Sequence, residues 1–138
     1  MSQIPMFPTQ RGNGPLVVAY GGGVNTVALL IRLRDLGERP TAIVMADPGS
    51  ERAATIAYRD TEMAEWLSHQ SWPSVTVVSL KSEARYRKKI HLTEQRSLLE
   101  ECMAIKALPS IAYGFKKCSL KHKARPANWW TERQSWAI

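Results

Sequence analysis

Three consecutive glycines followed by small polar residues are the stretch best suited to bind an anion. The glycines, residues 21–23, follow a short apolar run, and Asn25 and Thr26 come soon after them. Glycine has no Cβ atom, so it adopts positive φ angles and lets a ligand approach the backbone. A glycine turn that leads into a helix also presents free N–H groups and the positive end of the helix dipole. We therefore predict a phosphate-binding turn, and a tight turn without a ligand is the alternative.

Two common phosphate-binding motifs do not fit this stretch. A P-loop requires a lysine followed by serine or threonine after its last glycine, and no lysine stands there. A dinucleotide-binding fingerprint requires a third glycine where this sequence has Thr26. Any phosphate site at these glycines must therefore follow another pattern.

Apolar patterns on both sides of the glycines predict how the turn is held. Residues 16–20 form a β-branched apolar run typical of a buried strand. A one-sided apolar pattern predicts a helix over residues 27–36, with polar helix-start residues before it and Gly37 as its C-terminal cap. A second apolar run, residues 41–46, predicts another buried strand. Two strands joined by a helix predict a parallel pair with a right-handed crossover.

Acidic residues follow the second predicted strand. Asp47 and Glu51 lie in a turn that contains proline and glycine. Ligands of parallel sheets bind at the carboxyl ends of the strands, so we expect this turn to lie beside the glycines and Asp47 to hydrogen-bond a ribose hydroxyl. The alternative is structural, with Asp47 or Ser50 capping the next helix.

The next segment completes an α/β pattern. Residues 52–69 predict a helix with a one-sided apolar stripe, and residues 75–78 predict a third strand. Alternation of strands and helices predicts an α/β fold, a three-layer sandwich with a mainly parallel, Rossmann-like sheet. Such a sheet usually has more than three strands, so the three predicted strands are compatible with an incomplete sheet.

The sequence becomes basic from about residue 80. Residues 81–138 carry thirteen Lys and Arg against five Asp and Glu, whereas residues 1–80 carry six against seven. Within the basic part, residues 81–89 predict a loop or short helix, residues 93–103 a helix, and residues 126–136 a tryptophan-rich amphipathic tail. A basic half attracts phosphorylated ligands or nucleic acid, and a solvated basic face is the alternative.

Length and composition predict one domain. The chain has 138 residues, of which 44% are hydrophobic. We expect residues 1–14 to form a flexible N-terminal arm and residues 15–138 a single nucleotide-binding domain. No hydrophobic run is long enough to cross a bilayer, and the first residues lack a signal-peptide pattern. The sequence therefore predicts a cytoplasmic protein that does not contact a membrane.

Motifs in three places resemble one family. The glycine stretch resembles the loop S-G-G-x-D-S/T of the adenine nucleotide α-hydrolase (PP-loop) superfamily. Residues 47–58 resemble the A-D-T-G-S-E…T-Y signature of phosphoadenosine phosphosulfate reductase-like proteins. Residues 108–126 resemble the L-P-S…Y-G…C-S-x-K-x-K…P segment of a short branch of that family, common in phages and their hosts. The three motifs occur in the family's order and span about residues 15–130.

The resemblance implies a set of functional residues, carried over by position. It implies a loop that holds phosphates or sulfate, an acidic turn beside the nucleotide, and lysines that contact the anion through charge and hydrogen bonds. The implied ligand is an adenine nucleotide, ATP or phosphoadenosine phosphosulfate, with Mg²⁺ as an option. The residues are Gly21, Gly22, Gly23, Asn25 and Thr26 in the loop, Asp47 and Glu51 in the turn, and Lys117, Lys121 and Lys123 in the basic half. For each lysine, a solvated surface charge is the alternative.

Asn25 departs from the family pattern, which has an aspartate at this position. An amide can cap a helix or bind phosphate, but it is not an anionic partner for Mg²⁺ and not a base. This substitution affects the expectation of ATP–Mg²⁺ chemistry more than the expectation of anion binding.

The cysteines depart from the pattern as well. Reductases of the family use a nucleophilic cysteine near the end of a longer chain, and no cysteine follows Cys118 here. Reductase chemistry would require Cys118, which lysines and His122 surround in sequence, or Cys102, or the thiol of a partner. Packing of Cys118 against the sheet is the alternative. The spacing of the two cysteines and His122 lacks a C-x-x-C pair, so no metal site is predicted, and two cysteines cannot hold an iron–sulfur cluster alone.

Three hypotheses of function follow. The first is an adenine-nucleotide-binding protein that acts on an adenylyl compound or a sulfonucleotide. The second is a catalytically degenerate nucleotide-binding module that works in a complex, as a homo-oligomer or with a protein partner bound through the tryptophan-rich tail. The third is nucleic-acid binding through the basic half.

Overall fold

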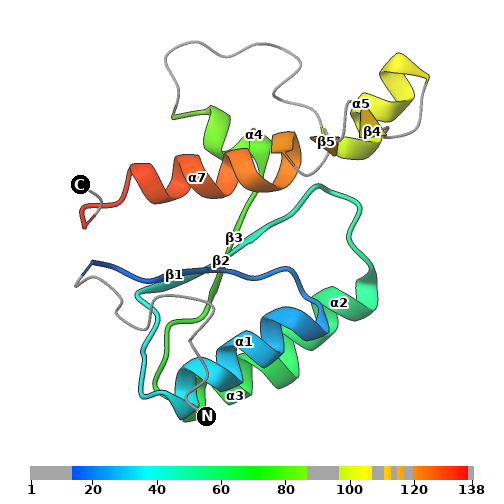
Figure 1. Cartoon of the computed structure of the whole chain (residues 1–138). Helices are drawn as coiled ribbons and strands as arrows, with labels where there is room; N and C mark the ends of the chain where they lie inside the picture. The colour runs from blue at the N-terminus through cyan, green and yellow to red at the C-terminus, as the bar shows by residue number, and fades with distance from the viewer. Residues whose placement is uncertain (1–13, 87–96, 107–110, 113–114, 117–119, 137–138) are drawn as a thin grey trace, which may run out of the picture.

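Three parallel strands form the central sheet of the protein. A computed structural model describes residues 14–86, 97–106, 111–112, 115–116 and 120–136. The strands are β1 (Val17–Ala19), β2 (Ala42–Ala46) and β3 (Val75–Val78), in the order β1-β2-β3, with β1 parallel to β2 and β2 parallel to β3. The predicted mixed α/β fold with a parallel sheet is confirmed (Figure 1).

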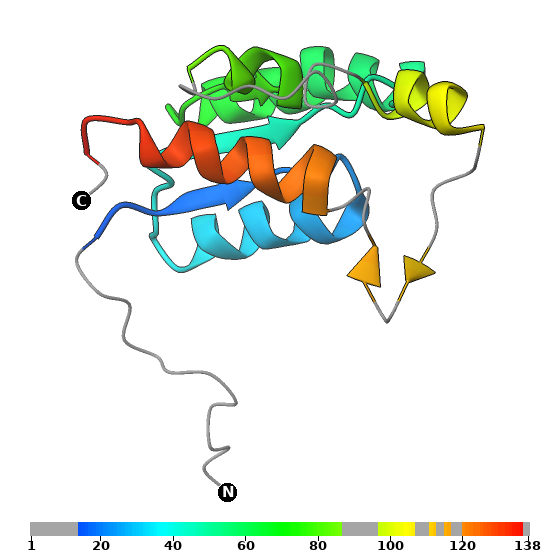
Figure 2. The same cartoon turned by 90° about the horizontal axis from the view of Figure 1, so that it is seen from above.

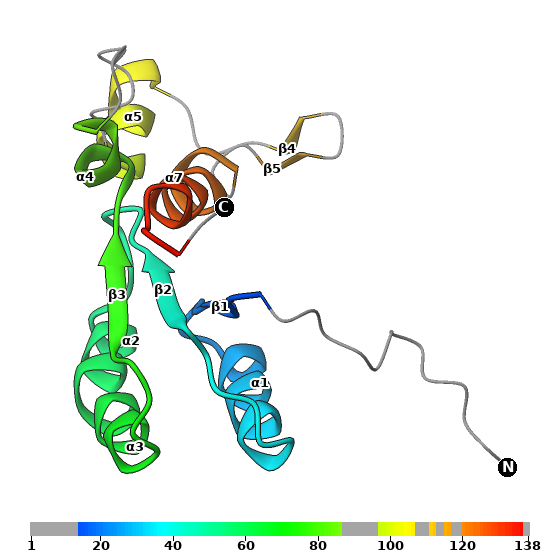
Figure 3. The same ribbon diagram turned by 90° about the vertical axis from the view of Figure 1, so that its left-hand side faces the viewer.

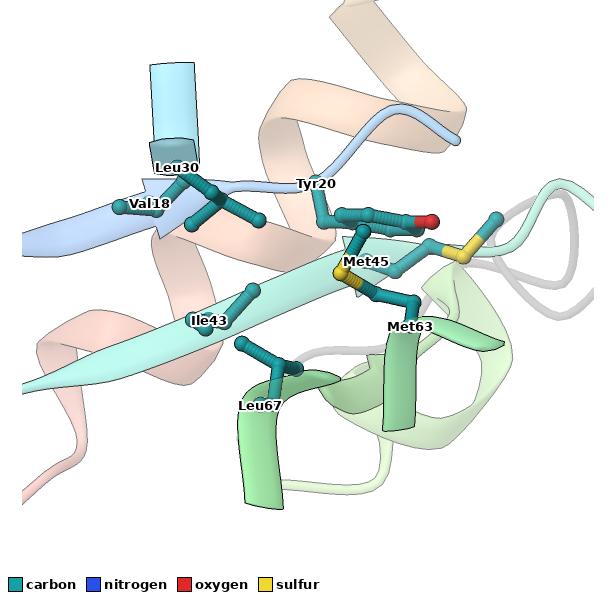
Figure 4. Packing of buried hydrophobic residues seen from close by; sticks show 7 residues of the cluster. All are labelled: Val18, Tyr20, Leu30, Ile43, Met45, Met63 and Leu67. Carbon is teal, nitrogen blue, oxygen red and sulfur yellow. The ribbon is translucent and has the colours of Figure 1, made fainter. Parts of the chain in front are cut away.

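Helices from the first half of the chain cover one face of the sheet. They are α1 (Val24–Asp35) and a continuous helical run made of α2 (Ala53–Tyr58), the π-helical turn η1 (Arg59–Met63) and α3 (Ala64–His69). Their apolar side chains meet those of β1 and β2 in one buried cluster (Figure 4). The cluster consists of Val18, Tyr20, Leu30, Ile43, Met45, Met63 and Leu67.

Helix α7 (Arg125–Glu132) covers the opposite face, so the sheet lies between two helical layers (Figure 3). The buried residues of this face are smaller, namely Ala42, Val44 and Val78. Trp130 and Trp136 pack against them, with their ring centroids 6.2 Å apart. Two of the tryptophans of the predicted amphipathic tail are therefore used inside the fold, and contact of the tail with a partner stays a prediction.

The remaining elements lie beyond the carboxyl ends of the strands. Helix α4 (Leu80–Ala84) follows β3 directly, and α5 (Leu98–Ile105) projects beside the carboxyl edge (Figure 2). A two-stranded antiparallel hairpin, β4 (Ile111–Ala112) and β5 (Phe115–Lys116), precedes the π-helical turn η3 (Leu120–Ala124), which leads into α7. No helix in the described parts of the chain is long and apolar enough to cross a membrane.

Three helix predictions need correction at their ends or in their interior. Helix α1 begins at Val24, just before the predicted helix-start residues Asn25 and Thr26, because Gly23 takes the extended N-cap conformation. The helix predicted over residues 52–69 is continuous but contains the π-helical turn η1, which no apolar pattern reveals. Helix α5 begins at Leu98 rather than at residue 93, since Ser97 and Glu100 form a capping box there.

Candidate functional site

The glycine turn, residues 21–23, is held by a threonine of α1. The Gly21 N–H donates to Thr26 Oγ1 over 3.1 Å, so the hydroxyl closes the turn onto the first turn of the helix. Gly22 has a φ of 77°, and a Cβ atom there would lie 2.5 Å from Thr55 Cγ2 of α2. Both the backbone conformation and the close approach of α2 therefore require glycine at position 22.

Asn25 lies at the start of α1, as predicted, but it does not cap the helix. Gly23 is the N-cap of α1, and no side chain caps this helix. Asn25 lies exposed in the first helical turn, and no hydrogen bond within the described residues engages its amide. The N–H groups at the start of α1 consequently lack a side-chain acceptor, which leaves them available to an external anion.

Asp47 shapes the acidic turn that follows β2. Its backbone N–H donates to the carbonyl of Val78 over 2.7 Å, and its Oδ1 accepts from the Gly49 N–H over 2.8 Å. Gly49 has a φ of 86°. The alternative that Asp47 or Ser50 caps the next helix is wrong, because Arg52 is the N-cap of α2 and no side chain caps it. Asp47 instead folds the turn through a local Asx-type hydrogen bond.

A cavity of about 300 Å³, here called the first cavity, lies between the carboxyl ends of β1 and β2 and the start of α7. Three of its lining residues come from the three separate sequence motifs: Gly21 from the glycine turn, Glu51 from the acidic turn and Lys123 from η3. Small side chains of β2 and α7 form most of its apolar walls. Its volume stands at the lower end of the range for small-molecule sites.

A second cavity of about 250 Å³ adjoins the first. Asp47, Ser97, Lys81 and His122 are among the residues that line it. Neighbouring residues are divided between the two cavities, because Ala46 and Lys123 line the first whereas Asp47 and His122 line the second. Asp47, predicted to face the nucleotide, therefore lines a different cavity from Glu51.

A partly exposed cluster of polar contacts around buried His122 holds α5 to η3. Glu101 of α5 accepts from Lys121 Nζ over 2.6 Å, and its other oxygen lies 2.7 Å from Nε2 of His122, which is 2% exposed. Burial raises the pKa of Glu101, but the hydrogen bonds and charges of Lys121 and His122 outweigh it, so this pKa lies below its ordinary value. Lys121, predicted to bind the anion, is engaged in this structural cluster instead.

Tyr20 carries a buried hydroxyl beneath the glycine turn. The residue is 3% exposed, and its hydroxyl has no hydrogen-bond partner among the described residues. Burial raises the pKa of Tyr20, the nearby Tyr58 raises it further, and the charge of Arg59 lowers it. Arg59 pairs with Asp60 through Nε over 2.8 Å. A neutral, unpartnered hydroxyl thus stands at the edge of the apolar cluster (Figure 4).

The predicted site residues separate into three groups. The glycine turn with Thr26, Glu51 and Lys123 gathers at or beside the first cavity. Asp47 and Lys121 lie elsewhere at the same edge, as described above. Lys117 and Cys118 lie outside the described residues. Where the structure describes the chain, no three His, Cys, Asp or Glu side chains gather to hold a metal ion.

Two lining residues have positions that the sequence did not predict. His122 was considered only together with the cysteines, and nothing local reveals its distant partner Glu101. Asn128 lines the first cavity together with Ala124 and Ala127 of the same helical region. The spacing of these three residues, i, i+3 and i+4, places them on one helix face, and that pattern is the signal that was available in the sequence.

Comparison with known proteins identifies no relative of this chain. No protein-family model, curated protein or solved structure matches the chain.

Proposed function

We propose that the protein binds an adenine nucleotide at the carboxyl end of its sheet. The base and sugar occupy the first cavity, and the phosphates extend to the glycine turn. The observation that carries the proposal is the first cavity itself, where Gly21, Glu51 and Lys123 meet although they stand far apart in the sequence. The carboxyl end of a parallel sheet is also where ligands of such folds bind.

The chemistry of the lining residues supports this assignment. The start of α1 offers backbone N–H groups and the positive end of its dipole to an anion. Lys123 is exposed and adds a cation that donates hydrogen bonds. Glu51 carries a carboxylate, which accepts hydrogen bonds only and therefore suits the hydroxyl donors of a sugar.

Binding without turnover is the second candidate function, and Asn25 favours it. In the resembling family an acid at this position would accompany Mg²⁺, whereas the exposed amide here carries no charge. Turnover would require attack on the α-phosphate or on sulfur, with the loop N–H groups stabilising the developing charge. An assay for AMP and pyrophosphate from ATP, or for sulfite from phosphoadenosine phosphosulfate, separates the two candidates.

Calorimetric titration with ATP, AMP and phosphoadenosine phosphosulfate, with and without Mg²⁺, tests the binding proposal. We expect saturable binding of at least one of them. Lys123→Ala should weaken that binding about tenfold, the loss expected for one charge-assisted hydrogen bond. Lys81→Ala removes the same charge from an exposed residue of the second cavity, so it is the matched control and should change affinity much less.

A second variant tests the glycine turn. Gly22→Asp places a Cβ against Thr55 and a carboxylate beside the phosphates, and it should abolish binding. Circular dichroism must show that this variant folds before its binding is interpreted. Absence of saturable binding to all three ligands by the unmodified protein would contradict the proposal, and so would equal losses from Lys123→Ala and Lys81→Ala.

A further inference from the structure

The wall that α7 contributes to the first cavity combines small apolar residues with one polar residue. Ala124 and Ala127 face the carboxyl ends of the strands, where Val44 and Ala46 of β2 form the opposite wall. Tyr20 and Met45 also line the cavity, so its walls are mainly apolar and suit the faces of a flat ring. Among the described residues that line the cavity, Asn128 brings the only amide side chain.

The Asn128 amide is available to a ligand. No hydrogen bond within the described parts of the chain engages it. Asn128 stands one helical turn beyond Ala124, about 6 Å along the axis of α7 at 1.5 Å per residue. Lys123 precedes that turn, so its cation and the Asn128 amide line the cavity at different positions along the helix axis. A nucleotide has the same order of groups, with phosphates at one end, the sugar between, and the base at the other end.

We infer that Asn128 reads the base of the bound nucleotide and selects adenine over guanine. A primary amide has one acceptor and a pair of donors, and it matches the N6 amino donor and the adjacent ring-nitrogen acceptor of adenine in a bidentate pair. The corresponding edge of guanine presents acceptors at both O6 and N7, which a single amide cannot match in the same way. This inference rests on the proposed function and names the residue that gives it specificity.

Replacement of the amide by a carboxylate should weaken ATP binding without creating a preference for GTP. Asn128→Asp leaves an acceptor-only group that loses the donor for the adenine ring nitrogen. On the same edge guanine presents only the acceptors O6 and N7, so the carboxylate forms no hydrogen bond with guanine. The measured quantity is the ratio of the ATP and GTP dissociation constants, because a change in overall charge affects both nucleotides alike and cancels in the ratio.

Titrations with ATP and GTP on four proteins test the inference. The unmodified protein should bind ATP at least tenfold more tightly than GTP, the discrimination expected for one bidentate pair. Asn128→Ala should bring the ratio close to one, whereas Asn128→Asp should weaken the binding of both nucleotides without moving the ratio past one toward GTP. Gln70→Glu makes the same amide-to-acid change at the end of α3, before β3 and away from the cavity, and it should leave the ratio unchanged.

The possible results distinguish this inference from the proposed function. If the unmodified protein binds ATP and the two Asn128 variants keep its preference, base reading by Asn128 is wrong while nucleotide binding stands. Equal affinity of the unmodified protein for ATP and GTP would overturn the inference in the same way. If neither nucleotide binds, the proposed function and the inference fall together. Asn128 is exposed, so its variants should keep the thermal unfolding temperature of the parent.

Discussion

Both helical layers pack on the sheet through apolar side chains, but the second also adds ion pairs between distant helices. On the first face, Leu30, Ile43 and Leu67 are at most 1% exposed and belong to one apolar cluster. On the second face Trp130 and Trp136 pack against smaller buried strand residues, and charged pairs join the surrounding helices. One pair links Glu83 of α4 to Arg133 after α7.

This difference bears on ligand binding, because the first cavity borders the second layer. The ion pairs between helices of the second layer depend on pH and on salt screening more than the apolar contacts of the first layer do. The first cavity lies where the ion-paired layer meets the sheet, since α7 and η3 form one of its walls. We therefore expect changes in the second layer to alter ligand binding while the first layer stays folded.

Leu67→Ala should have the largest effect on stability. Leu67 is 1% exposed in α3 and packs within the apolar cluster of the first face. Its truncation leaves a cavity and should lower the free energy of unfolding by about 3 kcal/mol, measured by urea denaturation. Leu36→Ala is the matched control, because Leu36 is 57% exposed and should lose little. Similar losses from both variants would show that the first face is not held by burial.

Arg133→Met should have the next largest effect. The guanidinium contacts the carboxylate of Glu83 through two hydrogen bonds of 2.9 and 3.1 Å, and Glu83 is 3% exposed. Loss of Arg133 leaves a buried charge without its partner and should lower the free energy of unfolding by about 2 kcal/mol, since Arg133 itself is partly exposed to water.

The double variant Glu83→Leu with Arg133→Met sharpens this test. It removes both charges and fills the site with apolar atoms, so it should recover most of the stability lost in Arg133→Met. If the double variant is no more stable than the single one, the pair is not what joins α4 to α7. Urea denaturation of the unmodified protein, the two single variants and the double variant gives the coupling free energy between Glu83 and Arg133.

Glu101→Gln should have a smaller, pH-dependent effect. The pKa of Glu101 lies below its ordinary value of 4.5, so the ionised form is favoured by folding. The corresponding stability is present above the ordinary pKa and is lost as the pH falls through the lowered one. We expect Glu101→Gln to reduce the free energy of unfolding by about 1.5 kcal/mol at pH 7. The difference from the unmodified protein should shrink as the pH is lowered toward 3.

A substitution in the other helical layer controls for general acid effects. Glu62→Gln removes the charge of an exposed carboxylate on η1, and it should change stability little at either pH. A difference between Glu101→Gln and the unmodified protein that stays constant from pH 7 to pH 3 would contradict the ionic role of the cluster. Urea denaturation at several pH values measures both variants.

The same contrast between layers explains how far the sequence could be interpreted. Strands 42–46 and 75–78 and the helices between them follow from apolar periodicity, because burial on the first face imposes a repeating pattern on the chain. The glycine turn was recognisable for a related reason, since the positive φ at Gly22 leaves few alternatives to glycine. Local patterns therefore predicted the first layer and one edge of the first cavity.

The second layer depends on pairings between distant residues, which leave no local pattern. Glu101 and His122 are 21 residues apart, and Glu83 and Arg133 are 50 apart. Each of these side chains alone resembles an ordinary surface charge. Lys121 was predicted to contact an anion from its position in the family motif, and its partner within the described residues is Glu101. The helical spacing of Ala124, Ala127 and Asn128 was visible in the sequence, but the cavity that these residues line depends on where α7 rests on the sheet.

Tyr20→Phe should have the smallest effect, with the opposite sign. Tyr20 is the one member of the apolar cluster that carries a hydroxyl, and that hydroxyl is buried without a partner among the described residues. Removing an unsatisfied buried polar group should raise the free energy of unfolding by about 1 kcal/mol. Tyr86→Phe removes a hydroxyl from a ring that is 58% exposed and should be neutral. A loss of stability in Tyr20→Phe would instead mean that the hydroxyl forms a hydrogen bond with a buried water. Polar contacts would then also stabilise the first face, and the two layers would differ less than their side chains indicate.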